Sequence, residues 1–513
     1  MNPTVPSSRA GKKHRPCPVL NGPISAADCG SQRGSRLNCP GTCPYFPFGP
    51  AGYDLWLKVD LEWMRKAVDR VIRVFGRDRL QAEMKAREIP LGGESLEVEA
   101  ALNHALHRLL FREPGPSGRT VADDWEAAGW EGLNNDERVM MRHRRGAAPA
   151  VVEVQRVLGR QSLVCLDLLD PARPPFVVMD RNAAAQTVRF TRLLTVLTDY
   201  PHFSTLGLPT VTILHPLWDA WWSAFQSRHT EAAAATPGLT PHAFLDQHLS
   251  EFIRLLTTLS EAHRGELLDQ LGLHQCLASF RLVGPAAELD AALRNHPAFR
   301  PATPPADPRY ATPLACFDWL EPASANPAET PGAAAGSGDK APPAAGTVRL
   351  YPEFLLVETS SRQRHARARS LIEEQFGAQV RFQEESVLDL TRAANIRDRR
   401  SALVEAAGNA VFGESTQGSP AAGPPPEPGE EPSVTAEQIL REHEERYRQF
   451  LDFAMPELGG LSPRQAAADP ERRSRLVAVL KTHLHNLELR NRREVIQLSI
   501  DWVLDELGLT ELK

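Results

Sequence analysis

The chain has 513 residues, enough for roughly three or four domains that each bury a core of their own. Apolar residues make up 42% of the chain and charged residues 24%, which is typical of globular proteins rather than disordered or fibrous ones. The formal net charge of -6 is small for this length and argues against a general nucleic-acid or membrane-surface binder, although it leaves room for local basic patches.

The N-terminal segment and the cysteine usage bear on the compartment. Residues 1–18 carry positive charge without an apolar run after it, so we expect no secretory signal. No uncharged apolar stretch is long enough to span a bilayer, and we expect no membrane contact. Seven cysteines, an odd number without regular pairing, suit a reducing compartment. We therefore expect a soluble cytoplasmic protein.

Four of the seven cysteines stand near the N-terminus with the spacing C-x11-C-x9-C-x3-C. They are Cys17, Cys29, Cys39 and Cys43. Four thiolates can close a tetrahedral shell around zinc, and the metal–ligand bonds would order a segment poor in regular structure. We therefore predict a structural zinc site in a module of residues 1–52. The alternatives are an iron–sulfur cluster on the same cysteines, His14 in place of one thiolate, or unligated surface thiols.

Residues 53–148 are predicted to be a helical region, because apolar residues recur at helical spacing. The apolar positions of the first helix are Leu57, Leu61, Met64, Val68 and Ile72, and the pattern stops at Gly76. Those of the second are Val98, Leu102, Leu106 and Leu109. His104 and His107 share one face of this second helix. Without a third ligand nearby, we interpret them as a partly buried pair and not as a metal site.

The period of the apolar residues changes in residues 149–225. Short apolar runs between 151 and 214 are separated by turn signals such as Asp170-Pro171. Several short strands at this spacing predict a small antiparallel β domain, either an open sheet or a barrel.

Residues 226–412 are predicted to be a mixed α/β region. Its helices are expected at 243–263 and 362–377, and its strands at 277–284, 349–361 and 378–386. Two segments lack the large apolar residues that would offset the cost of ordering them. We predict a flexible insertion at 321–346 and a domain linker at 413–433.

Residues 434–513 are predicted to form a helical domain that folds by itself. Three helix starts are visible: Thr435 with Gln438 as a capping box, Ser462-Pro463, and Asp469-Pro470. One helix carries an apolar stripe of Leu476, Leu480, Leu484 and Leu487. A last helix is expected over 493–509.

Two stretches resemble known bacterial sequences. Residues 455–480 share a pattern of Gly-Gly, Ser-Pro-Arg, Ala, Asp-Pro and an apolar helix, carried by Gly459, Gly460, Ser462, Pro463, Arg464, Ala466, Asp469 and Pro470. This pattern resembles a segment of uncharacterised bacterial proteins, many of which carry a SEC-C metal-binding tail. It is more loosely similar to the toxin-binding domain of Xre/MbcA/ParS-type antitoxins. Residues 151–170 resemble the small sheet domain of the SEC-C-associated group, although this chain has no SEC-C motif at its C-terminal end.

Together these patterns predict a multidomain α+β protein. The chain has no G-x-S-x-G, P-loop or glycine-rich dinucleotide motif, so no nucleophile or cofactor site is indicated. We expect a non-catalytic binding or regulatory protein that engages a protein partner, with the Gly459-Gly460 turn and Arg464 as the candidate surface. One alternative is an enzyme whose site is assembled from residues distant in sequence. The other is a nucleic-acid binder that uses the arginine-rich stretches 142–145 and 360–370.

Overall fold

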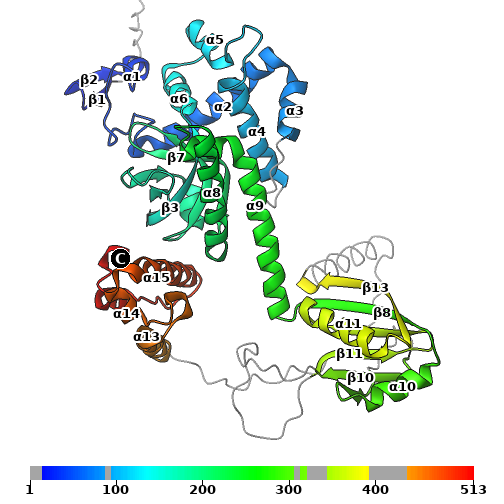
Figure 1. The fold of residues 1–513 in the computed structure, drawn as a ribbon. Coiled ribbons are helices and arrows are strands. Elements are labelled where there is room, and N and C mark those ends of the chain that lie inside the picture. Colours follow the sequence, from blue (N-terminus) through cyan, green and yellow to red (C-terminus); the bar gives the residue numbers. More distant parts are fainter. Residues whose placement is uncertain (1–13, 87–93, 305–311, 321–343, 392–435) are drawn as a thin grey trace, which may run out of the picture. The chain divides into compact units, whose positions relative to one another are not determined.

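The computed structural model describes residues 14–86, 94–304, 312–320, 344–391 and 436–513 (Figure 1). The predicted linker, residues 321–343 of the predicted insertion and the predicted cap Thr435 lie outside these residues. Residues 344–346 of the insertion are described, and a strand begins with them. The chain forms two compact units, Met1–Leu259 with Pro428–Lys513, and Ser260–Glu427. Helices and sheets both occur in quantity, which confirms the predicted α+β multidomain class.

The first unit begins with a small module and a group of helices. The module holds β1 (His14–Cys17), β2 (Gly22–Ser25) and α1 (Ala26–Gln32). The helices that follow are α2 (Tyr53–Phe75), α3 (Arg77–Ala86), α4 (Glu94–Phe111), α5 (Val121–Ala127) and α6 (Asn135–Arg145). As predicted, α2 ends at Gly76, whose φ of 84° is a conformation that glycine adopts readily.

Next come a barrel and two long helices. The barrel elements are β3 (Ala148–Leu158), β4 (Ser162–Asp167), β5 (Phe176–Met179), α7 (Arg181–Gln186), β6 (Arg192–Asp199) and β7 (Ser204–Ile213). The long helices are α8 (His215–Ala235) and α9 (Pro241–Gln270), the second of which continues into the other unit.

The strands close into a barrel in the order β3-β4-β5-β7-β6. The predicted small antiparallel sheet or barrel is therefore a barrel, with one parallel seam where Val178 of β5 pairs with Ser204 of β7. Strand β3 is buried over most of its length because both of its faces are covered. Val152 packs with Val154 and Leu193 in one core of the barrel strands, whereas Val151 packs with the apolar residues of α8 and α9.

The apolar face of α2 differs from the predicted one. Leu61 is 71% exposed and Leu57 is also exposed, and the buried residues are Tyr53, Trp56, Trp63, Ala67 and Val71. The aromatic side chains decide which face of α2 is turned to the core, because burying each of them removes more apolar area from water than burying a leucine does. Asp60 lies on the inward face and interrupts its apolar pattern. In α4, Val98 is likewise exposed, although Leu106 and Leu109 are buried as predicted.

The C-terminal helices belong to the first unit. They are α13 (Ala436–Asp452), α14 (Pro463–Ala468), α15 (Pro470–Asn491) and α16 (Asp501–Glu506). The predicted helix starts at Ser462 and Asp469 are confirmed, because each side chain accepts a hydrogen bond from a backbone N–H in the first turn. All four leucines of the predicted stripe on α15 are buried.

The predicted last helix over 493–509 is wrong in its first half, since α16 begins only at Asp501. Asn491 accounts for the difference. Its side-chain amide donates to the carbonyl of Leu498 at 2.8 Å and accepts from the N–H of Leu498 at 2.9 Å. An asparagine side chain that bonds to nearby backbone in this way competes with helix formation.

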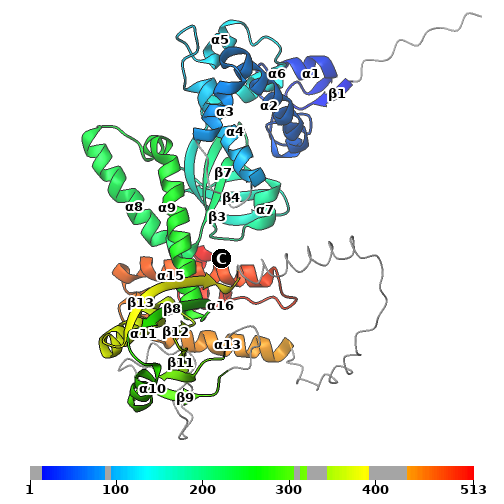
Figure 2. The same cartoon turned by 90° about the vertical axis from the view of Figure 1, so that its right-hand side faces the viewer.

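Helix α15 docks on the barrel (Figure 2). Phe190, which precedes β6, packs in the core of the C-terminal helices. The buried carboxylate of Glu153 on β3 accepts from Arg192 at 3.1 Å and from Lys481 of α15 at 2.5 Å. Burial alone would raise the pKa of Glu153, but Lys481 and Arg192 outweigh it and lower this pKa. Arg189 adds a second pair, with Glu488 at 2.6 Å.

We expect Glu153→Ala to lower the free energy of unfolding of this unit by about 3–5 kcal/mol, because it leaves the buried charge of Arg192 without a counterion. Urea unfolding followed by circular dichroism measures the change. The matched control is Glu494→Ala, which removes an exposed pair with Arg490 and should cost about 1 kcal/mol or less. Equal losses in the two variants would show that the Glu153 cluster does not hold the docked helices.

Two histidines face each other in the same interface. The rings of His215 and His485 lie 4.4 Å apart, and His215 Nδ1 is 3.2 Å from the Thr482 hydroxyl. Burial lowers the pKa of His215 to about 4, and the nearby His485 and Arg192 contribute in the same direction. Burial also lowers the pKa of His485.

This interface should make the first unit less stable in acid. In the unfolded chain His215 has its ordinary pKa of 6.5, so between pH 6.5 and 4 the unfolded state binds more protons than the folded state. The contribution of neutral His215 is present above pH 6.5 and is lost as the pH falls toward 4. The urea midpoint of the natural chain should therefore drop more between pH 7 and pH 5 than that of His215→Asn. The same drop in both would contradict this linkage.

In the part that the structure describes, the second unit holds the end of α9, one sheet and the helices α10 and α11. Its elements are β8 (His274–Leu282), α10 (Ala286–Asn295), β9 (Phe299–Ala302), β10 (Ala315–Leu320), β11 (Ala344–Leu350), β12 (Phe354–Thr359), α11 (Arg362–Phe376) and β13 (Val380–Asp389). The strand order is β13-β8-β12-β11-β10-β9, and every neighbouring pair is antiparallel. Leu293 of α10 and Ile372 of α11 pack in one core with Phe280 and Val357 of the sheet.

Candidate functional site

The four N-terminal cysteines come from separate parts of the module. Cys17 ends β1, opposite Gly22 of β2, and Cys29 lies in α1. Cys39 and Cys43 lie in the loop that follows, where the N–H of Cys43 donates to the carbonyl of Pro40 at 3.0 Å and closes a turn. All four thiols are free and buried in one core. The alternative of four surface thiols is therefore wrong.

The four thiols lie within electrostatic range of one another. Burial raises the pKa of the Cys39 thiol, a backbone N–H of Gly34 opposes this, and the other three cysteines raise the pKa further. Across the described ranges, however, no group of three or more His, Cys, Asp and Glu side chains is arranged so that it could hold a metal ion. The cysteines therefore share one core without forming a closed ligand shell. Their number and chemistry fit the tetrahedral four-thiolate shell of zinc.

The module is attached to α6 and to the barrel. Arg33, just after α1, donates to Asp136 of α6 with Nε 2.9 Å from the carboxylate, and Asn135 donates to the carbonyl of Arg33 at 2.8 Å. His202, between β6 and β7, holds the carbonyl of Cys39 at 2.8 Å. These hydrogen bonds therefore tie the cysteine loop to α6 and to the turn between β6 and β7.

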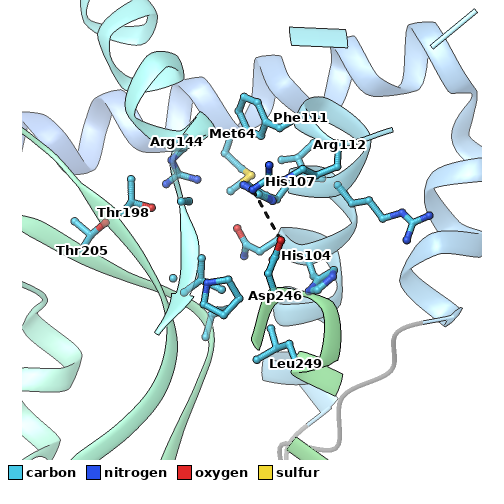
Figure 3. A pocket seen from close by; sticks show the side chains of 18 of the residues that line it. Met64, His104, His107, Phe111, Arg112, Arg144, Thr198, Thr205, Asp246 and Leu249 are labelled. Carbon is cyan, nitrogen blue, oxygen red and sulfur yellow. Dashed lines mark ion pairs between the residues drawn. The ribbon is translucent and has the colours of Figure 1, made fainter. Parts of the chain in front are cut away.

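A cavity of about 670 Å³ lies between helices α2, α4 and α6 and the barrel strands β6 and β7 (Figure 3). Its helical wall presents aromatic and charged side chains, and its strand wall presents the hydroxyls of Thr198 and Thr205. Helix α9 contributes Asp246, which points toward Arg112 of the helical wall at 3.9 Å. Cavities of this volume are typical of small-molecule sites.

Arg144 and Asp60 form an ion pair in the cavity wall. The guanidinium group of Arg144 bonds to the Asp60 carboxylate and lies over the ring of Trp63, 4.3 Å from its centroid. Burial raises the pKa of Asp60, and Arg144 opposes this shift. Because the two charges compensate each other, the pair adds no net charge to the cavity.

Several polar atoms of this wall lack a partner. Among the residues that the structure describes, no hydrogen-bond partner is present for Nε1 of Trp56, Nε1 of Trp63 or Nε of Arg144, all of which are buried. The hydroxyl of Tyr200 lies beside Arg144 and Trp56, whose donors oppose the rise that burial causes in the pKa of this phenol. Buried donors in proteins are normally satisfied. These donors have almost no accessible surface, so they lie behind the cavity wall and not on the face that a bound molecule would touch.

The two histidines singled out on the second predicted helix both line this cavity. Burial lowers the pKa of His107 to about 4, and Arg112 and His104 add to the shift, so His107 is uncharged at neutral pH. Sequence reasoning missed Asp60, Trp63 and Arg144. The available sequence signal for this site was Asp60, an aspartate on the inward side of the amphipathic helix α2.

The arginine-rich stretches are engaged within the chain. In 142–145, Arg144 pairs with Asp60, and Arg145 lies 3.1 Å from Asp123. In 360–370, Arg369 pairs with Glu373 at 3.1 Å and with Glu385 at 2.8 Å. Arg144, Arg145 and Arg369 are therefore compensated, which lowers the attraction that these three cations could exert on phosphates.

Comparison of the chain with protein-family models, with curated proteins and with solved structures finds no match. The resemblances to the SEC-C-associated group and to antitoxin domains therefore stay predictions. Among the described helices, none combines the length and the apolar character needed to cross a bilayer.

Proposed function

We propose that this chain is a non-catalytic binding protein whose N-terminal module is held together by one structural zinc ion. The observation that carries the metal is the burial of four free thiols, from β1, α1 and the following loop, in one core. Cys17, Cys29, Cys39 and Cys43 would be the ligands, with an iron–sulfur cluster on the same cysteines as the alternative. A closed four-thiolate shell leaves no open position, so the ion stabilises and does not react. Free cysteines also support a reducing compartment, the cytoplasm.

The cavity supports binding more than catalysis. His107, with its pKa of about 4, is a weak base at neutral pH, and Arg144 is tied to Asp60. Among the described residues that line the cavity there is no serine, cysteine or lysine, and the hydroxyls of Thr198 and Thr205 are not hydrogen-bonded to a histidine or a carboxylate that could activate them. An enzyme assembled from distant residues is therefore the weaker candidate.

A protein partner remains part of the proposal, but the C-terminal turn gives it no support. On the surface of the helical bundle, Arg464 pairs with Asp452 at 2.9 Å and with Glu506 at 2.6 Å. The guanidinium group of Arg472 lies 3.4 Å from where a side chain on Gly459 would begin. Arg464 therefore serves contacts within the chain, and the positive φ values of Gly459 and Gly460, 71° and 84°, account for the two glycines.

Purified under reducing conditions, the natural chain should contain about one zinc per molecule, because four thiolates bind one ion. Cys17→Ser and Cys39→Ser should each lose most of this zinc, which inductively coupled plasma mass spectrometry measures. The matched control is Cys316→Ala, which removes a buried thiol of the second unit and should keep the full zinc content.

Two results decide against this proposal. Protein that holds neither zinc nor iron would exclude a metal in the module. Zinc retained in Cys17→Ser and Cys39→Ser at the level of the control would place the ion elsewhere. Iron with visible absorbance instead of zinc would select the iron–sulfur alternative.

A further inference from the structure

We infer that one face of the sheet in the second unit, the face opposite α10 and α11, binds single-stranded nucleic acid. RNA and DNA are the two sources of the same phosphate and base chemistry. The inference goes beyond the function proposed above, because neither the cysteine module nor the cavity belongs to this unit. Three properties of one row of side chains carry it: their common face, two unpaired cations and an exposed aromatic ring.

The sheet register defines this row. Helices α10 and α11 cover one face of the sheet (Figure 1). Phe280 of β8 and Leu355 of β12 lie in the core beneath them, so the residues next to them in each strand point to the other face. On that face Arg381 of β13 lies opposite Arg281 of β8, and Arg281 lies opposite Phe354 of β12. The three side chains therefore form one row across neighbouring strands.

The two arginines of the row lack a counterion. Both are exposed, and among the described residues neither takes part in an ion pair. Glu384 of β13 and Glu353, just before β12, lie near the row but form no ion pair with either arginine. Side chains directly opposite each other in an antiparallel pair stand about 5 Å apart, where like charges are destabilising. A phosphate that accepts from both guanidinium groups removes this repulsion.

Phe354 supplies a surface for a base. It is 36% exposed, and its ring stacks on that of Tyr351, with the two centroids 4.5 Å apart and an angle of 16° between the planes. The N–H of Tyr351 donates to the carbonyl of Phe354 at 2.8 Å, so the two residues pair across the turn between β11 and β12 and hold the ring in place. Stacking on an aromatic side chain favours single strands, because the bases of a duplex are already stacked on one another.

The exposure of the row sets the size of the ligand. Small molecules bind in concave sites that bury most of their surface. Arg281, Arg381 and Phe354 are all exposed, so they would leave most of a free nucleotide in water. A strand of several nucleotides gains contacts along the row instead, with phosphates on the arginines and a base on Phe354.

Fluorescence anisotropy of the full chain tests the inference with labelled dodecamers. The probes are a single-stranded RNA, the DNA strand of the same sequence and the RNA duplex, and inorganic polyphosphate is a competitor that carries charge without bases. At about 50 mM salt we expect at least one single strand to bind more tightly than the duplex. The tighter of the two single strands identifies the source.

Variants locate the site. Arg281→Gln and Arg381→Gln should each weaken binding several-fold and lower the slope of log affinity against log salt by about 0.7, since each removes one phosphate contact. Phe354→Leu should weaken binding about tenfold and leave this slope unchanged, because stacking releases no counterion. The matched control is Arg294→Gln on α10, which removes an exposed cation paired with Asp290 and should leave affinity and slope nearly unchanged. All four substituted side chains are exposed, and circular dichroism confirms that each variant folds.

The results that overturn the inference are distinct. No binding of either single strand at about 50 mM salt, or a duplex bound as tightly as the strands, would exclude a single-strand site. Affinities of the three row variants equal to that of Arg294→Gln would place the nucleic acid elsewhere on the chain. Full displacement by polyphosphate together with an unchanged affinity of Phe354→Leu would reduce the row to a site for simple anions. The zinc measurement is independent of each of these results.

Discussion

The ion pair between Arg144 and Asp60 joins α6, the helix that leads into the barrel, to α2. Arg144 is the second-last residue of α6, and β3 of the barrel begins at Ala148, so the position of this guanidinium group fixes where the barrel starts. Asp60 lies on the inward face of α2, and Trp63 one turn later supports the guanidinium group from below. Among the described residues neither charge takes part in another ion pair, so the contact ties α2 to α6 at this point. Their meeting also creates one wall of the cavity.

Paired charges of this kind recur wherever two parts of the unit meet. Arg33 and Asp136 join the cysteine module to α6, and Glu153 joins β3 to α15 through Lys481. Taking such charges out of water costs about as much as their attraction returns, so these pairs add little net stability. What they impose is position, because a displaced partner would leave a buried charge uncompensated. Apolar packing supplies the stability, and the pairs select one arrangement.

Helix α6 connects the two candidate sites. Asp136 in its first turn holds the loop of the cysteine module, and Arg144 in its last turn lines the cavity. The capping box of Asn134 and Glu137 fixes the start of this helix. A metal that orders the module would therefore also hold the helix that shapes the cavity. The proposed ion in the cysteine module and the cavity would in this way be coupled through the short helix α6.

The sequence by itself determined the elements whose signals are local. The stop of α2 at Gly76, the caps Ser462 and Asp469, and the stripe of α15 each depend on neighbours in the chain, and all are confirmed. It also singled out the four cysteines as a group. Only the tertiary structure decided which face of α2 is buried, where α16 begins and that a cavity exists. These depend on contacts between residues far apart in sequence, such as Asp60 with Arg144, whose energy a local pattern does not contain.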